Sequence, residues 1–376
     1  MKRQLTRAMG TMMRERILLS AGLALLAAVG VAHAAESPGL RFEYGDWELA
    51  CDNTRTCRAA GYHSTSGSDD EDAEAAGNGE PMPVSVLFTR KAGPNEAVRG
   101  EFQIGNPGAD ETTDQLPQRM TLAMTINGQA HGKVLIEQGK WTVDLAPAQT
   151  QALLAALTRS SRIAWSDGTR TWRLSDKGAA AVLLKMDEFQ GRLGTPGALV
   201  RKGARDEKTV LPPLPAPVVV AVAVPRQDLV TWPKARLDAL RAALKTQAED
   251  CPVLTEPGES PNEIIVRRLS GGKLLASTLC WRGASNTGDA YWVINATPPY
   301  APELVTSYGA GYDDGKIDGS QKGRGMGDCW AFEHWTWDGK RFIHTNLGNS
   351  GACNGIAPGG AWSLPTLVTT VRKPGG

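Results

Sequence analysis

The stretch from Gly45 to Cys57 constrains the fold of this chain more than any other. It places Trp47 and two cysteines, Cys51 and Cys57, directly after an apolar–polar alternation over residues 40–44. Between the cysteines, an Asp-Asn-Thr sequence favours a tight backbone turn. We therefore predict two strands joined by a small loop, with the indole of Trp47 packed against one face of the sheet. The stretch is typical of a structural device and not of a catalytic one.

The chain begins like an export signal. Five basic residues precede an apolar run over residues 17–32, and Ala32-His33-Ala34 supplies the small residues that a signal peptidase needs. We predict cleavage before Ala35, because the apolar run is shorter than the roughly 20 residues of a spanning helix. An uncleaved membrane anchor is the alternative. Residues 1–34 hold five of the 41 Lys and Arg and one of the 40 Asp and Glu, so the mature chain carries a formal charge of −3. This charge gives no reason to expect nucleic acid or an anionic membrane surface as a partner.

The cysteine count predicts disulfides. All six cysteines lie after the signal, and an even count in an exported chain is typical of disulfide bonding. Spacing alone leaves fifteen pairings open. We predict the sequential set, because each bond then closes within one proposed domain: Cys51–Cys57, Cys251–Cys280 and Cys329–Cys353. A zinc site has little support, since the chain has no Cys-x-x-Cys and no His at ligand spacing from a cysteine pair.

The length of about 340 mature residues favours two domains. Four prolines within residues 211–217 exclude a helix or a central strand there, so we predict an extended spacer. The predicted fold class is α+β, with two β-rich domains and a few packed helices, joined by this Pro-rich spacer and stapled by disulfides. The predicted boundaries are a signal peptide over 1–34, an N-terminal α+β domain over 35–207, a linker over 208–226 and a C-terminal α+β domain over 227–376.

Hydrophobic periodicity and turn residues predict the individual elements. Strands are expected at 38–60 on either side of the cysteine loop, and then at 84–91, 98–104, 120–126, 133–137, 140–145, 163–174 (a hairpin), 218–224, 263–269, 273–280, 290–295, 328–345 (a hairpin) and 361–372. Helices are expected to begin at Pro147, Gly178 and Pro233. The Gly- and Asp-rich residues 313–319 are interpreted as a chain of turns, and the acidic tract Asp69–Glu74 as part of a solvated, mobile loop and not as a calcium site.

No catalytic signature occurs in the sequence. Gly-x-Ser-x-Gly and His-Glu-x-x-His are absent, and the glycine-rich segments lack the spacing of a phosphate loop. The hairpin over 328–345 carries Trp335, Trp337 and Arg341, which are residue types common in recognition surfaces, although core packing is the favoured interpretation of the tryptophans. His334 and His344 are expected to face each other across this hairpin as a surface pair.

Several separated motifs resemble one known family. They are Asp46-Trp47 with the Cys51–Cys57 loop, Met186-Asp-Glu-Phe-Gln-Gly-Arg-Leu-Gly194, Ala198-Leu-Val-Arg-Lys-Gly203, Cys280-Trp-Arg-Gly-Ala284 and Trp337-Asp-Gly-Lys-Arg-Phe342. Together they resemble the uncharacterised bacterial envelope family known as domain of unknown function 1176, over nearly the whole mature chain. The first domain is also loosely similar to invasion-associated locus B proteins. The resemblance implies a periplasmic or secreted protein and brings no catalytic residues.

The sequence therefore predicts an exported, non-enzymatic protein that binds a partner. The expected partner is another envelope or secreted protein, or a cell-wall component, with no nucleic acid, no membrane span after signal cleavage and no cofactor or metal. The alternative is a hydrolase whose site is assembled from distant residues of the C-terminal domain, for example Asp328, Glu333 and His334.

Overall fold

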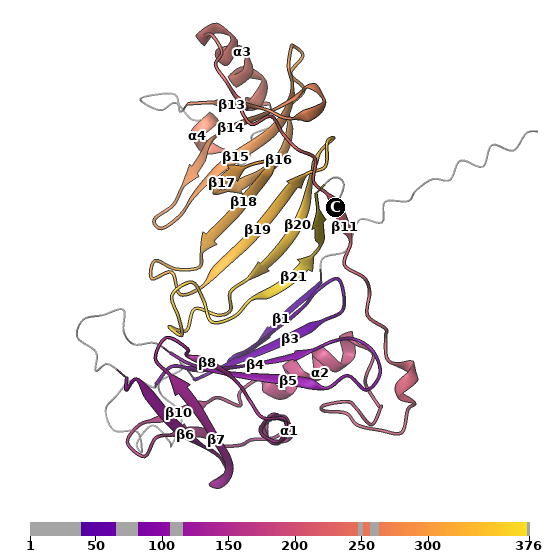
Figure 1. The fold of residues 1–376 in the computed structure, drawn as a ribbon, viewed down its shortest axis with the longest axis vertical. Helices are drawn as coiled ribbons and strands as arrows, with labels where there is room; N and C mark the ends of the chain where they lie inside the picture. The colour runs from indigo at the N-terminus through magenta and orange to yellow at the C-terminus, as the bar shows by residue number, and fades with distance from the viewer. Residues whose placement is uncertain (1–38, 65–81, 106–115, 247–250, 256–262, 374–376) are drawn as a thin grey trace, which may run out of the picture. The chain divides into compact units, whose positions relative to one another are not determined.

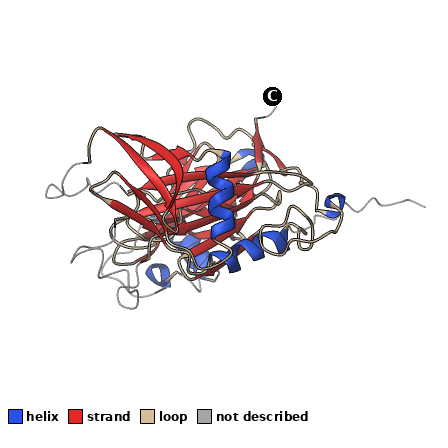
Figure 2. Cartoon of the chain, turned by 90° about the horizontal axis from the view of Figure 1, so that it is seen from below, coloured by secondary structure: helices blue, strands red, loops and turns tan. Residues whose placement is uncertain are grey.

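Strands dominate the structure, a computed structural model that describes residues 39–64, 82–105, 116–246, 251–255 and 263–373 (Figures 1 and 2). Within these ranges the chain forms several sheets and four α-helices, so it is mostly β and less helical than the α+β prediction suggests. The described residues form one compact unit, and the division into two domains at the spacer stays a prediction. The predicted signal peptide and the acidic tract Asp69–Glu74 lie outside the described residues.

The N-terminal part contains two antiparallel sheets and two helices. The six-stranded sheet has the order β1 (Leu40–Tyr44), β2 (Trp47–Cys51), β3 (Cys57–Tyr62), β4 (Val84–Arg90), β5 (Val98–Ile104) and β8 (Thr142–Asp144). The four-stranded sheet has the order β10 (Thr171–Leu174), β9 (Ile163–Ser166), β6 (Arg119–Ile126) and β7 (Gln129–Glu137). The helices are α1 (Pro147–Ala156) and α2 (Ala179–Phe189), and a 3₁₀ turn spans Glu207–Thr209.

The loop between β2 and β3 forms for the reasons that the sequence suggests. The Asp52 carboxylate accepts hydrogen bonds from the backbone N–H groups of Thr54, at 2.9 Å, and Thr56, at 3.2 Å. Arg55 takes up the left-handed conformation that closes the turn, with a φ of 68°. Cys51 and Cys57 are register partners and form a disulfide. The other two predicted pairs, Cys251–Cys280 and Cys329–Cys353, are also confirmed.

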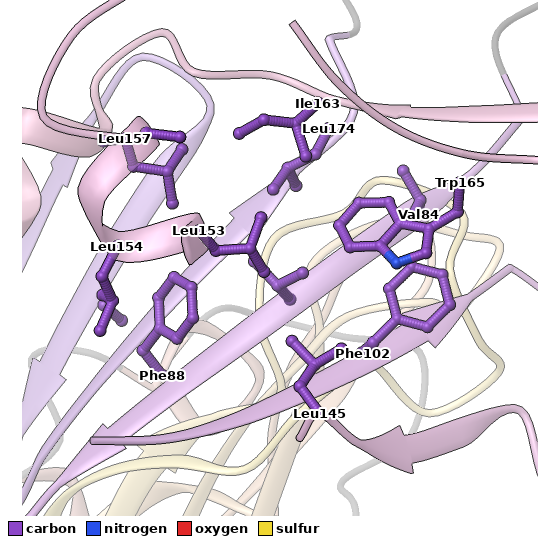
Figure 3. Close-up of a cluster of buried hydrophobic side chains, with 14 of the residues drawn as sticks. Val84, Phe88, Phe102, Leu145, Leu153, Leu154, Leu157, Ile163, Trp165 and Leu174 are labelled. Atoms are coloured by element: carbon purple, nitrogen blue, oxygen red, sulfur yellow. The ribbon is translucent and has the colours of Figure 1, made fainter. Parts of the chain in front are cut away.

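One apolar core joins both N-terminal sheets to the two helices. The ring centroids of Trp165 and Phe102 lie 4.4 Å apart, and the two rings pack between the four-stranded and six-stranded sheets. Leucines of α1 point toward Phe88 of β4 in the same core (Figure 3). Pro147 fits the first turn of α1, where its missing N–H costs nothing. Trp47 is buried at 2 % exposure and packs in this core, as the sequence predicts.

The C-terminal part contains two five-stranded sheets. The first has the order β12 (Leu229–Val230), β13 (Ile265–Arg268), β14 (Lys273–Arg282), β15 (Thr287–Asn295) and β16 (Glu303–Gly309). The second has the order β17 (Gly311–Asp313), β18 (Lys316–Lys322), β19 (Trp330–Trp337), β20 (Phe342–Asn349) and β21 (Leu364–Val368). Apolar side chains of α3 (Lys234–Lys245) and α4 (Pro252–Thr255) cover one face of the first sheet. Its other face packs against the second sheet.

The segment over 313–319 differs from its prediction. The expected chain of turns is wrong, because the segment forms a single tight turn between β17 and β18. Asp314 and Gly315 both have positive φ, 42° and 77°, which suits a two-residue hairpin loop. Strand β16 was also not predicted from the sequence.

The spacer is an extended, ordered segment. Its residues Val218–Val220 form β11, which pairs in parallel with β22 (Thr370–Arg372) at the C-terminal end of the chain. The predicted strand over 218–224 is therefore shorter than expected, and its partner is the last strand. Further along, the N–H of Val222 donates to the carbonyl of Trp337 at 2.9 Å.

Candidate functional site

The hairpin of β19 and β20 holds most of the side chains that the sequence singles out. Successive residues of β19 point to opposite faces of the sheet. Glu333, Trp335 and Trp337 lie on the face toward the first C-terminal sheet, which we call the inner face. Trp330, Phe332 and His334 lie on the other face, which we call the outer face. The two faces of one strand thus have different chemistry.

The inner-face tryptophans belong to the core. Trp337 is fully buried, and its indole N–H donates a 2.7 Å hydrogen bond to the Ser270 hydroxyl. Trp335 is 7 % exposed and packs in the same cluster as Ile317. Arg341 is exposed in the hairpin turn. Of the three predicted recognition residues, therefore, only Arg341 lies at the surface, because the inner face of β19 is covered by the neighbouring sheet.

The outer face of β19 carries a row of half-buried aromatic side chains. The rings of Phe332 and His334 lie nearly parallel, with centroids 6.3 Å apart and 27° between their planes. Phe332 leans over Gly348 of β20, where a Cβ would lie only 2.7 Å from the end of the phenyl ring. A glycine at this position therefore gives the Phe332 ring its place on the sheet. Trp330 extends the row toward one end of the strand.

Polar groups of β18 flank this row. Nδ1 of His334 lies 2.6 Å from Oδ1 of Asp318, its register partner, and their side chains are 41 % and 55 % exposed. Nζ of Lys322 lies 5.4 Å from the centre of the Trp330 ring, within the range of a cation–π contact. The outer face of β18 and β19 therefore combines aromatic surface with both signs of charge. We call Asp318, Lys322, Trp330, Phe332 and His334 the outer-face cluster.

A second histidine pairs on the inner face. The His344 ring stacks on Trp335 with centroids 4.9 Å apart and 13° between the planes. Its Nε2 lies 3.7 Å from Oε2 of Glu333, which is too far for a hydrogen bond. Burial raises the pKa of Glu333 and lowers the pKa of His344, so the environment favours the neutral form of both groups.

The predicted facing pair of histidines does not form. His334 pairs with Asn346, and His344 pairs with Trp335. The hairpin turn sets Trp337 opposite Phe342, a register that already places His344 opposite Trp335, and a one-residue register shift in β20 then places Asn346 opposite His334. This β-bulge changes which face the following residues of β20 present. The two imidazoles consequently have different partners, Asp318 for His334 and Glu333 for His344.

The three residues of the hydrolase alternative are held apart. Asp328 accepts hydrogen bonds from Arg324 at 2.7 and 2.5 Å and from the N–H of Gly355 at 2.7 Å. Burial acts to raise the pKa of Asp328, but these hydrogen bonds outweigh it, and the pKa lies below its usual value. Asp328 therefore orders the loop beside Cys329. Glu333 and His334 point to opposite faces of β19, so the structure does not bring the three together.

Within the described ranges, no group of three or more His, Cys, Asp and Glu side chains could hold a metal ion. In the same ranges, no helix is both long enough and apolar enough to span a membrane. Sequence reasoning did not place Asp318, Lys322 or Phe332 of the outer-face cluster in a recognition site. The signal that could have found them is the alternation of β18 and β19 once these strands are known to pair.

The matches to known proteins agree with the sequence motifs. A family model described as "Protein of unknown function (DUF1176)" matches residues 41–369. The chain belongs to this family. It is similar to the "Uncharacterized protein YpfG" of Escherichia coli (strain K12), with 27 % identity over 392 aligned positions that cover 95 % of this chain and 100 % of the relative. No solved structure matches the chain. The likeness of the first domain to invasion-associated locus B proteins stays a prediction.

Proposed function

We propose that this protein is exported to the bacterial envelope, where it binds another envelope or secreted protein, or a cell-wall component, without catalytic activity. Export is supported by the signal-like residues 1–34 and by the three disulfides, since disulfides persist in oxidising compartments. The mature chain then starts at Ala35. The mass of the protein purified from periplasm tests this start, and a chain that keeps residues 1–34 contradicts it.

Binding is supported above all by the row of Trp330, Phe332 and His334 on the outer face of β19. Aromatic side chains that remain partly exposed supply large, rigid contact area and are enriched at recognition sites. Here they stand beside Asp318 and Lys322, which offer hydrogen-bond partners of both kinds. Tyr312 and Trp337, in contrast, already pack against Phe342 and are not free to contact a partner.

The experiment is a pull-down in which the mature protein and a double variant, Phe332→Ala with His334→Ala, serve as baits in parallel. Two probes are used, cross-linked periplasmic extract and purified peptidoglycan sacculi. Tyr44→Ala is the matched control, because Tyr44 is an exposed aromatic residue in β1, outside the cluster. We expect a bound protein, or sacculus binding, that the control retains and the double variant loses by at least tenfold. Equal binding by both variants would place recognition elsewhere.

A hydrolase is the second candidate, and the Glu333–His344 pair is the observation that favours it. Both side chains are about one-third exposed, and burial raises the pKa of Glu333 and lowers the pKa of His344. Turnover of peptidoglycan or peptide substrates that is abolished by Glu333→Gln, with the fold intact, would replace the binding proposal. Turnover that survives Glu333→Gln would exclude this pair as the catalyst.

A further inference from the structure

The spacer has an unusual surface. Residues 210–225 contain no polar side chain over sixteen consecutive positions. The segment nevertheless runs along the outside of the molecule and is held there by hydrogen bonds to the residues of the β2–β3 loop (Figure 1). The N–H of Leu214 donates to the carbonyl of Thr54 at 3.2 Å, and the Arg55 guanidinium donates to the carbonyl of Pro212 at 2.8 Å.

Exposed apolar side chains concentrate on this segment and on its partner strand. Twelve large apolar residues are exposed in the described part of the chain, and five of them lie here: Leu211 (38 %), Leu214 (43 %), Val218 (52 %), Val220 (49 %) and Val371 (41 %). Clusters of this kind mark interaction sites more often than single exposed residues do. The patch lies apart from the outer-face cluster in sequence and in strand, so it needs an explanation of its own.

Strand β11 also offers a free backbone edge. The N–H of Thr370 donates to the carbonyl of Pro217, and the N–H of Ala221 donates to the carbonyl of Arg372, both at 2.8 Å. Backbone groups of successive strand residues point to alternate edges, so those of Val218 and Val220 point away from β22. Within the described residues β11 has β22 as its one strand neighbour, and it is labelled beside the C-terminus in Figure 1. Natural proteins usually guard such an edge with charges or with a covering segment.

We infer that β11 pairs with β11 of a second copy of this chain, in antiparallel orientation about a two-fold axis. The edge is complementary to itself. Centred on Val219, the pairing sets Val218 of one copy opposite Val220 of the other, apolar against apolar. The pairing joins the β11–β22 pairs of the two copies into one four-stranded sheet in the order β22, β11, β11, β22. The outward N–H and C=O groups of Val218 and Val220 in both copies then have hydrogen-bond partners.

Charge does not oppose this pairing. Residues 210–225 bring no charged side chain to the contact, and the nearest basic strand residue, Arg372, lies in β22, one strand away from the edge. The two Arg372 side chains then stand about three strand spacings apart, roughly 14 Å, which exceeds the Debye length of about 8 Å at physiological ionic strength. A partner rich in acidic residues has no matching cations along this edge, so a second copy fits the edge better.

The contact is small. Five partly exposed side chains and three strand residues supply less than the roughly 800 Å² per partner that a stable interface buries. We therefore expect a reversible dimer whose population rises with concentration, with a dissociation constant on the order of 10 µM. The contact is apolar, so raising the salt concentration leaves it nearly unchanged.

Sedimentation velocity of the purified mature protein between about 1 and 100 µM tests the dimer, with expected masses rising from one to two chains. Val220→Lys and Val218→Pro should each raise the dissociation constant of the dimer at least tenfold. The first places like charges in the apolar contact, and the second removes an outward N–H that β22 does not use. Met326→Lys, at a 75 % exposed apolar residue outside the patch, should leave it unchanged. Near-ultraviolet circular dichroism establishes that each variant is folded.

A cysteine cross-link tests the register. Residue 219 of one copy lies opposite residue 219 of the other, so Val219→Cys should form a disulfide-linked dimer on mild oxidation. Met326→Cys, which is more exposed, should not. A protein that remains monomeric at all concentrations overturns the inference. So does a dimer that Val220→Lys and Val218→Pro leave intact, or an edge that captures only a different protein.

Discussion

The backbone N–H of Ala352 donates a 2.7 Å hydrogen bond to Oε1 of Glu48, 304 residues earlier in the chain. The Tyr62 hydroxyl donates to the same carboxylate oxygen at 2.7 Å, and both side chains are almost completely buried. Around them, Ala50, Ala60 and Leu87 of the six-stranded sheet pack against Ile356 and Leu364 of the C-terminal part. The indole N–H of Trp362 donates to the Ser85 hydroxyl at 2.7 Å within the same contact. The first sheet and the last strands are thus held by specific buried polar contacts as well as by apolar packing.

Glu48→Ala should lower the free energy of unfolding by about 2 kcal/mol, because the Tyr62 hydroxyl loses its acceptor and the N–H of Ala352 keeps only its longer bond, at 3.0 Å, to the Tyr62 oxygen. Glu48→Gln keeps a carbonyl oxygen at this place and should cost less. Urea denaturation followed by tryptophan fluorescence measures both. Arg41→Ala is the control, since that side chain is exposed and lies 3.8 Å from the Glu48 carboxylate, beyond hydrogen-bond distance. Equal losses for the Ala and Gln variants would contradict this role of the acceptor.

The buried Glu48 carboxyl should also make the stability of the protein depend on pH. Burial raises the pKa of Glu48 above its usual 4.5, which outweighs the hydrogen bond from Tyr62. Between the unfolded and the folded pKa the native state binds more protons than the unfolded state, so stability falls as pH rises through that window. The amide of the Glu48→Gln variant cannot ionise, so the stability of this variant relative to wild type should increase as pH rises above 4.5. Unfolding free energies at pH 4 and pH 7 check this, and an unchanged difference would rule it out.

A buried arginine ties the end of α2 to β4. Arg192 is fully buried, and its guanidinium donates to Oε1 of Gln190 at 2.9 Å and to the carbonyls of Lys91 and Gly93 at 3.0 and 2.7 Å. Arg192→Met should lower the free energy of unfolding by about 3 kcal/mol or more, since three acceptors, two of them on buried residues, lose their donor. Arg205→Met, at an exposed arginine nearby, is the matched control and should cost under about 1 kcal/mol. Thermal and urea unfolding report the difference.

The three disulfides should contribute differently to the free energy of unfolding. On the chain-entropy model, the bonds that close 24 and 29 residues stabilise by about 3 kcal/mol, and the bond over 6 residues by about 2 kcal/mol. Paired Cys→Ser variants of each bond, unfolded in urea, give the order. Removing Cys329–Cys353 should also loosen the neighbouring Ala352 contact with Glu48. The losses of unfolding free energy from this variant and from Glu48→Ala should therefore add up to more than the loss in the combined variant. Full additivity would show that the loop holds its place without the bond.

The sequence by itself determined the local structure of this protein, because local structure depends on residues that are close along the chain. Alternation and turn residues located most strands, the helices at Pro147, Gly178 and Pro233, and the Cys51–Cys57 hairpin, whose Asp52 bonds its own loop. The sequential cysteine pairing followed from chain order in the same way.

Only the tertiary structure decided which face of each strand is covered. A period of two separates Trp335 and Trp337 from Phe332 and His334, but it does not say which pair meets the neighbouring sheet. The register of the β19–β20 hairpin sets His344 opposite Trp335 and not opposite His334, and no local pattern marks that register. The parallel pairing of β11 with β22 and the bond from Ala352 to Glu48 join residues more than 140 positions apart. Such contacts depend on how whole sheets pack, which the propensities of neighbouring residues do not determine.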